Sequence, residues 1–209
     1  MPAFLIGIDP PEVYRRDIVR LKDMIRREAG LQQQLDEPPH CTLVLNNFVE
    51  LDRVDDALRR IALTYSPMQV ELLKEIRYFP PRRSGAYMVH ARVRRTPTLR
   101  KLQERIVTDT APARFVKDPL LPRYLRANVP GYQYTGEELA NNKRFGYPYV
   151  GENWIPHISL GILARPAFRR VWPELEQADA HYEFPLREIT LFEYKKRWEP
   201  MKRYELSLK

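Results

Sequence analysis

The sequence predicts an α+β domain with about seven strands. Its length of 209 residues suits one domain, or two closely packed lobes, that can bury a substantial core. Hydrophobic residues make up 44% and charged residues 30%, which is an ordinary balance for a soluble globular protein. Along the chain, apolar runs with a period of two residues alternate with segments of helical spacing, so strands and helices are mixed.

Apolar spacing and helix-boundary residues place the individual elements. Before residue 111 we expect, in order, a strand at 3–8, a helix within 9–30, a first motif strand, a helix at 54–65, strands at about 68–79 and 85–95, and a helix that begins at Thr96-Pro97. After residue 153 we expect a second motif strand, a helix from Pro166, and strands near 183–194 and 202–208 joined by the basic turn 195–197.

Two short stretches of the chain are nearly identical in pattern. They are Pro39-His40-Cys41-Thr42-Leu43 and Pro156-His157-Ile158-Ser159-Leu160. Each has a proline before the histidine, a hydroxyl two residues after it and a leucine three residues after it. The chain has only four histidines, and two of them occur in this shared context.

Strand geometry gives this repeat a chemical meaning. Side chains on a strand alternate between faces, so residues two apart point the same way. His40 and Thr42 are therefore expected on one face of the first strand, and His157, Ser159 and Gly161 on one face of the second. The apolar residues between them form the opposite, core-facing side. Each copy thus predicts a strand whose polar face carries an imidazole and a hydroxyl.

Two such units suit acid–base chemistry at phosphorus. An imidazole has an ordinary pKa of about 6.5, so near neutral pH it can take up or release a proton. One histidine can deprotonate a nucleophile while the other protonates the leaving oxygen, and each transfer typically contributes about 10²–10⁴-fold in rate. The Thr42 and Ser159 hydroxyls are short donors suited to nonbridging phosphate oxygens. A pair of these units would hold a phosphodiester without a metal.

The paired motifs resemble those of the two-histidine (2H) phosphoesterase superfamily, and most closely its LigT-like branch of bacterial RNA 2′,5′-ligases and cyclic phosphodiesterases. The terminal apolar stretches 4–8, 189–192 and 204–208 are also similar to that group, so the resemblance covers most of the chain. It implies a bilobal fold of two antiparallel sheets related by a pseudo-twofold axis around a central cleft, with helices on the outside. Residues 1–209 would form one such domain of two intimately packed lobes.

The resemblance also implies an activity. It predicts metal-independent hydrolysis of 2′,3′-cyclic phosphate ends of RNA or nucleotides, or of 2′,5′ linkages, with ligation as the reverse reaction. By motif match, His40 and His157 would be the catalytic acid and base, in an order that the near-equivalent motifs leave open. Thr42 and Ser159 would bind the phosphate. No cofactor and no metal are expected, and zinc is disfavoured because the chain has one cysteine and no histidine pair at metal-ligand spacing.

The segment 111–153 departs from the pattern and lengthens the separation of the motifs. It is rich in Pro, Gly, Asn and Tyr without a sustained period, so we expect an irregular insertion or lid. Its aromatic and basic residues suit single-stranded nucleic acid, since bases stack on aromatic faces and phosphates pair with cations. Alternatively, its tyrosines pin a long loop to the body. Candidate substrate-binding residues in and just after it are Arg123, Tyr124, Tyr147, Tyr149 and Trp154.

Two other functions remain open. The first is an RNA-binding module without turnover, for which the net charge of +8 and the aromatic segment argue. The second is a phosphodiesterase for a small nucleotide such as an ADP-ribose cyclic phosphate. His90 lacks a hydroxyl two residues later and is left out of the chemistry, although it could border the cleft. His181 is expected at the surface.

Composition also bears on location and partners. Cys41 is the only cysteine, which excludes an intrachain disulfide and favours a reducing compartment, and it is expected to be a buried small residue rather than a nucleophile. The apolar run at 3–8 is too short for a signal sequence, and no stretch reaches the roughly 20 residues of a membrane span. We expect a cytoplasmic monomer that binds RNA or a nucleotide and no membrane.

Overall fold

A computed structural model gives the fold of this chain and describes residues 2–30, 32–79, 85–115 and 134–207. The helices are α1 (Glu12–Ala29), α2 (Gln33–Asp36), α3 (Leu51–Thr64), α4 (Pro97–Thr110), α6 (Gly136–Phe145) and α7 (Arg165–Gln177). The strands are β1 (Ala3–Ile8), β2 (Cys41–Asn46), β3 (Met68–Phe79), β4 (Ala86–Val93), β5 (His157–Ala164), β6 (Tyr182–Leu186), β7 (Glu188–Tyr194) and β8 (Trp198–Glu205). The predicted α+β class is confirmed.

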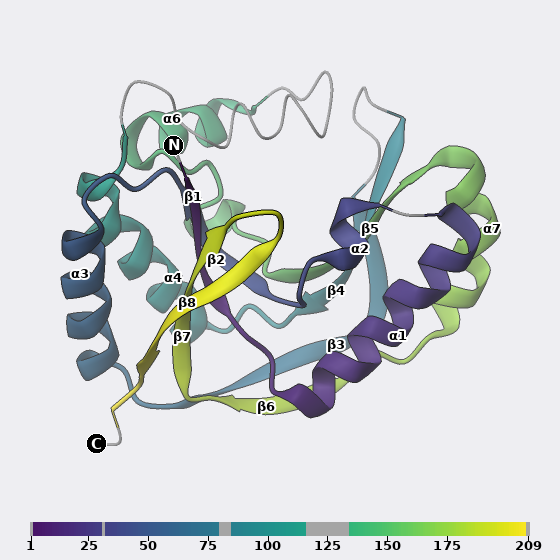
Figure 1. Ribbon diagram of the computed structural model, residues 1–209, viewed down its shortest axis with the longest axis horizontal. Coiled ribbons are helices and arrows are strands. Elements are labelled where there is room, and N and C mark those ends of the chain that lie inside the picture. The colour runs from purple at the N-terminus through teal and green to yellow at the C-terminus, as the bar shows by residue number, and fades with distance from the viewer. Residues whose placement is uncertain (1, 31, 80–84, 116–133, 208–209) are drawn as a thin grey trace.

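The strands form an antiparallel sheet in the order β6-β3-β4-β5-β2-β1-β7-β8. The two motif strands, β5 and β2, lie next to each other in the middle, and each begins a half of four strands. The sheet curls strongly, as Figure 1 shows. The two sheets that we expected are therefore the two halves of one sheet, because β2 and β5 pair across the centre.

This central pairing is short. Within the described residues it consists of Cys41 of β2 opposite Ile158 of β5. The two strands overlap only near this pair, because they are antiparallel and each continues away from it, β2 toward Asn46 and β5 toward Ala164. The two halves therefore belong to one sheet but are joined only over this short stretch.

Helices cover the outer surface of each half, as expected. α1 and α7 pack against each other and against β5, while α3 and α4 pack together against the half that contains β2 and β8 (Figure 1). The apolar stripe of α1 explains its docking, because Ile18, Leu21 and Ile25 lie on one face and are buried. Thr96 caps α4 by accepting a hydrogen bond from the Leu99 N–H.

Part of the segment 111–153 is helical, which differs from the expected irregular structure. α6 has a capping box in which Thr135 and Glu138 each accept a hydrogen bond from the other's backbone N–H. It ends at Gly146 in the left-handed conformation. The helix was missed because only Glu138 in it is fully buried, so it lacks the apolar stripe that periodicity detects.

The strands at the C-terminal end also differ from expectation. The strand expected near 183–194 is two strands, β6 and β7, which lie in opposite halves of the sheet and are separated at Arg187. The turn at 195–197 is confirmed as a hairpin turn, in which the Lys195 N–H donates to the Arg197 carbonyl. β8 begins directly after it at Trp198, earlier than predicted.

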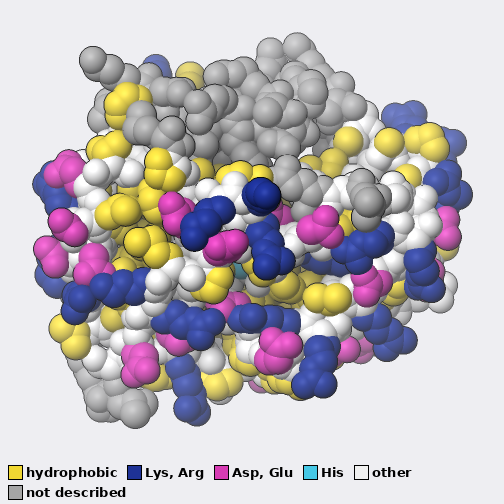
Figure 2. Space-filling model, viewed as in Figure 1, with side chains coloured by type: hydrophobic (Ala, Val, Ile, Leu, Met, Phe, Trp, Pro, Cys, Tyr) yellow, Lys and Arg dark blue, Asp and Glu magenta, His cyan; other side chains and the backbone are white. Residues whose placement is uncertain are grey.

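Charge is dispersed over the face that Figure 2 shows. Lys and Arg side chains lie among Asp and Glu side chains instead of forming one continuous patch. The excess of basic residues therefore does not by itself mark a binding surface on this face. Among the described residues, every helix is too short or too polar to pass through a bilayer.

Candidate active site

The four motif residues come together on one face of the sheet. Cys41 pairs with Ile158, and both side chains are 1% exposed against the core. Because neighbours on a strand point to the opposite face, His40, Thr42, His157 and Ser159 flank this pair on the other side. All four are partly exposed where the residues between them are buried. Each imidazole thus lies across the junction from the hydroxyl-bearing residue of the other motif.

A β-bulge follows the hydroxyl in both motif strands. In β2 the register shifts at Leu43, between the pairs Gly7–Thr42 and Ile6–Val44. In β5 it shifts in the same way at Leu160, between the pairs His90–Ser159 and Val89–Gly161. Bulges twist strands and re-aim side chains, and they are common beside active sites.

The second bulge overturns one expectation of strict alternation. Gly161 was expected on the polar face with His157 and Ser159. A Cβ added to Gly161 would instead lie 3.2 Å from Ile25 of α1 and 3.5 Å from Leu35, so this position faces the helices. The extra residue, Leu160, moves the following part of β5 to the other face.

The tautomer of each motif histidine is set by a backbone carbonyl two residues before it. His40 Nδ1 lies 2.8 Å from the Pro38 carbonyl oxygen, and His157 Nδ1 lies 2.7 Å from the Ile155 carbonyl oxygen. A carbonyl oxygen can only accept, so Nδ1 carries the hydrogen in each ring. Nε2 is therefore the ring nitrogen that is left to accept a proton in each neutral imidazole.

The proline of the shared motif contributes to this arrangement. Pro39 and Pro156 each follow the residue whose carbonyl accepts the hydrogen bond from Nδ1. A proline restricts the preceding residue to extended conformations, which limits where that carbonyl can point. The sequence already contained this signal in the repeated Pro-His dipeptide.

Both imidazoles favour the neutral form in the free protein. The pKa of His40 is lowered to about 4, chiefly by burial, with smaller contributions in the same direction from the charges of Lys22 and His157 and an opposing effect of the Pro38 carbonyl. Burial also lowers the pKa of His157, with a smaller contribution in the same direction from Arg92. The contribution of His157 to the lowered pKa of His40 agrees with their positions on neighbouring strands.

Core side chains complete the hydrogen bonding of β2 beyond its pairing with β5. The Trp154 indole N–H donates to the Thr42 carbonyl at 3.0 Å. The Gln103 side-chain amide, which is fully buried on α4, donates to the carbonyl of the bulged Leu43 at 3.0 Å. These bonds tie the backbone of β2 next to the motif to Trp154 and to α4.

The structure places the substrate-binding candidates differently from the motif residues. Tyr147 and Trp154 are 4% and 2% exposed and belong to the hydrophobic core. Tyr149 packs partly buried against that core, and its carbonyl accepts a hydrogen bond from Gln103. Arg123 and Tyr124 lie outside the described residues. The three described residues thus pin the segment to the body, which was the alternative interpretation of its tyrosines.

His90 is closer to the site than its sequence context indicated. Its ring is 2% exposed, stacks on Phe79 with centroids 4.2 Å apart, and lies 5.1 Å from the ring of His157. Burial, together with the charge of His157, lowers its pKa to about 3. His90 is therefore a neutral packing neighbour of His157, and its pairing with Ser159 became visible only with the register of β4 on β5.

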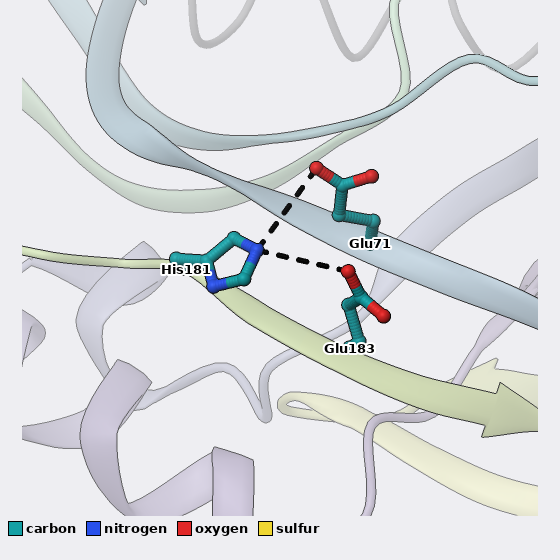
Figure 3. A group of neighbouring side chains, drawn as sticks. All are labelled: Glu71, His181 and Glu183. Atoms are coloured by element: carbon teal, nitrogen blue, oxygen red, sulfur yellow. Dashed lines mark ion pairs between the residues drawn. The ribbon is translucent and has the colours of Figure 1, made fainter.

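Cys41 and His181 behave as the sequence predicted. Cys41 is buried as a free thiol, and burial raises its pKa to about 12, which leaves it protonated and unreactive. His181 is exposed on the edge of the sheet, where its Nε2 lies 4.0 Å from Glu71 and 3.9 Å from Glu183 (Figure 3). These three groups could face a cation. However, Arg94 already forms a forked ion pair with both carboxylate oxygens of Glu71, so we assign no metal to them.

Comparison with solved structures identifies the fold. The structure matches TT0787 of Thermus thermophilus with a TM-score of 0.59 and 16% identity, covering 99% of this chain and 98% of that one. E. coli LigT complexed with 3′-AMP matches with a TM-score of 0.53 and 18% identity over 100% of both chains. LigT complexed with phosphate matches with a TM-score of 0.51 and 17% identity over 99% of both. None of the curated protein sequences matches this chain.

These likenesses define a LigT-like phosphoesterase fold with two histidine motifs at its centre. The sequence model of the 2′-5′ RNA ligase superfamily matches residues 10–198, which span both motifs. The chain therefore belongs to the 2′-5′ RNA ligase superfamily, the two-histidine phosphoesterases. The enzymes of this superfamily carry out phosphoester chemistry on nucleotide or RNA substrates.

Proposed function

We propose that this protein is a phosphodiesterase that opens 2′,3′-cyclic phosphates at RNA or nucleotide ends by paired-histidine acid–base catalysis. The observation that carries the proposal is the Cys41–Ile158 pair, because its register sets both motif histidines and both motif hydroxyls on one face. The superfamily supports phosphoester chemistry of this kind. The hydroxyls and imidazoles together provide what an in-line displacement at phosphorus requires.

The reaction uses each ring through its Nε2 atom. One neutral imidazole takes a proton from water as the water oxygen forms a bond to phosphorus. The bond between phosphorus and one ribose oxygen breaks, and the other imidazole, as imidazolium, gives its Nε2 proton to that oxygen. The product is a phosphomonoester with a free neighbouring hydroxyl. Attack by a ribose hydroxyl in place of water gives ligation at the same site.

The bound phosphate adjusts the protonation of the pair. In the free protein, burial keeps the pKa of both imidazoles below the ordinary value. A phosphodiester anion between them stabilises imidazolium and raises the pKa of each ring. Substrate binding therefore creates the one-protonated pair that the reaction needs. Thr42 and Ser159 donate their hydroxyl hydrogens to the nonbridging oxygens, where charge accumulates in the transition state.

The decisive experiment is hydrolysis of uridine 2′,3′-cyclic phosphate with EDTA present. We expect H40A and H157A each to lower kcat by about 10²–10⁴-fold, since each removes a proton-transfer group. H181A is the matched control, because His181 lies on the exposed edge of the sheet with its side chain 50% exposed. Its rate should equal that of the wild type.

The result that would overturn the proposal is a measured rate that neither H40A nor H157A reduces. RNA affinity that depends on salt, survives loss of both histidines and occurs without any turnover would instead indicate an RNA-binding module.

A further inference from the structure

Arg92 lies immediately beside the proposed catalytic pair, on the side of His157 that faces away from His40. In the ladder between β4 and β5, Arg92 is directly opposite His157. Directly paired residues on neighbouring strands point to the same face, so the Arg92 side chain leaves the sheet next to the imidazole. Its charge lowers the pKa of both His157 and His90, which agrees with this placement.

The guanidinium of Arg92 is exposed and has neither an ion pair nor a hydrogen bond within the part of the chain that the structure describes. Other arginines near the sheet are neutralised. Arg94 forms a forked pair with Glu71, and Arg95 pairs with Glu152. Arg92 is thus a cation beside the candidate site whose charge no described carboxylate offsets.

A buried cation lies on the His40 side of the site. The charge of Lys22 contributes to the lowered pKa of His40, and its ammonium donates to the backbone carbonyls of Gln34 and Glu37 at 2.8 Å and 2.7 Å. Lys22 is 2% exposed, whereas Arg92 is exposed at the surface. Of these two cations, Arg92 is therefore the one that a ligand can reach.

The order of the strands fixes where an anion at Arg92 would lie. A phosphorus atom between the two motif histidines sits over β5 and β2, whereas Arg92 is on β4, on the far side of His157. Neighbouring strands are about 4.8 Å apart. A long guanidinium side chain at that position is suited to a phosphate outside the histidine pair rather than to the reacting phosphorus. Phe79, whose ring lies 5.3 Å from that of His157, adds an aromatic neighbour on the same side.

We propose that Arg92 binds a second, non-reacting phosphate of the substrate, and that the preferred substrate is therefore the end of an RNA chain rather than a nucleoside cyclic monophosphate. This inference rests on the proposed function, because it assumes that the reacting phosphate lies between His40 and His157. The second phosphate is the internucleotide linkage next to the terminal cyclic phosphate. A pyrophosphate offers the same charge, so the experiment includes a substrate of that kind.

The test compares three substrates: uridine 2′,3′-cyclic phosphate, the dinucleotide UpU with a terminal 2′,3′-cyclic phosphate, and ADP-ribose 1″,2″-cyclic phosphate. We expect the wild type to favour the dinucleotide over the mononucleotide in kcat/KM, and R92Q to lower this preference about tenfold, as the loss of a charged hydrogen bond implies. R92K should recover most of it. The slope of log KM for the dinucleotide against log salt should become shallower by about 0.7 in R92Q.

R60Q is the matched control, because Arg60 is an exposed arginine on the outer helix α3. It should leave the preference unchanged. Thermal melting and circular dichroism establish that each variant is folded, and R92K keeps the test valid if R92Q is not.

The outcomes separate this inference from the proposed function. A dinucleotide preference that R92Q retains, in an enzyme whose turnover needs both histidines, overturns the role of Arg92 and leaves the proposed function intact. If R92Q lowers kcat/KM for the ADP-ribose compound but not for the dinucleotide, the RNA assignment is overturned. Histidine-independent turnover, or none with any of the three substrates, refutes the proposed function and this inference together.

Discussion

Cys41 and Ile158 pair across the middle of the sheet and join two strands whose sequences lie more than a hundred residues apart. Both side chains point into the core, where each is 1% exposed. This one pair determines which neighbours share the opposite face. The pairing therefore brings the two copies of the motif together, so that their two imidazoles and two hydroxyls lie on one face of the sheet.

The pH dependence of the proposed reaction should differ between free and bound enzyme. Burial disfavours imidazolium, so the pKa of His40 falls to about 4 and that of His157 falls below its ordinary value. Because turnover needs one neutral and one protonated ring, kcat/KM should be bell-shaped, with its maximum between the two pKa values, above about pH 4 and below about pH 6.5, and should decline on either side. The bound anion raises both pKa values, so the decline of kcat should occur at higher pH. Steady-state kinetics from about pH 4 to about pH 9 measures both profiles. If kcat and kcat/KM decline at the same pH on the alkaline side, this explanation is contradicted.

The motif hydroxyls should act on the transition state. T42V and S159A each remove one donor to the phosphate and should lower kcat about 10²-fold, with a smaller effect on KM. T190V is the control. Thr190 and Thr42 both pair with Gly7, from opposite sides, so the two threonines lie in one row across the sheet. The Thr190 hydroxyl, however, is buried and has no hydrogen-bond partner among the described residues. Removing it should leave kcat unchanged. Rates of T42V and S159A equal to that of T190V would remove the hydroxyls from the mechanism.

Gly7 should tolerate no side chain. It pairs with Thr42 at the bulge, where an added Cβ would lie 2.8 Å from the Cys41 carbonyl oxygen and 2.8 Å from Leu5. The carbonyl belongs to the central pair and cannot move freely, so G7A should lower the free energy of unfolding by about 1–3 kcal/mol. G136A is the control, since a Cβ there meets nothing within 4 Å. Urea denaturation of the two variants measures the difference, and equal stabilities would show that the bulge can relax.

Trp154 should stabilise the first motif strand instead of binding substrate. W154F keeps a large apolar ring but leaves the Thr42 carbonyl without the indole donor. We expect a loss of about 1–3 kcal/mol in the free energy of unfolding. KM for the dinucleotide cyclic phosphate should be unchanged. W172F, at a partly buried tryptophan on α7, controls for the loss of ring area. A raised KM in a W154F protein of normal stability would restore the substrate-binding interpretation.

Much of the fold could be predicted from local sequence. The helix boundaries at Gly30 and Thr96 agree with the structure because capping and proline placement act over a few residues. α6 was missed, since its capping box is present in the sequence but its apolar stripe is not. Gly161 was placed on the wrong face because a bulge is a property of two paired strands and leaves no period in one of them.

The candidate site, like the fold, could be predicted from the sequence only in part. By itself, the sequence predicted which residues would carry the proposed chemistry, because a duplicated Pro-His-x-Thr/Ser-Leu pattern specifies an imidazole and a hydroxyl on one side of each strand. Only the tertiary structure decided that the two strands are adjacent, that His90 and Arg92 flank His157, and that Tyr147 and Trp154 are buried. The physical reason is that alternation along a strand is local, whereas the partner and register of a strand depend on pairing between distant segments.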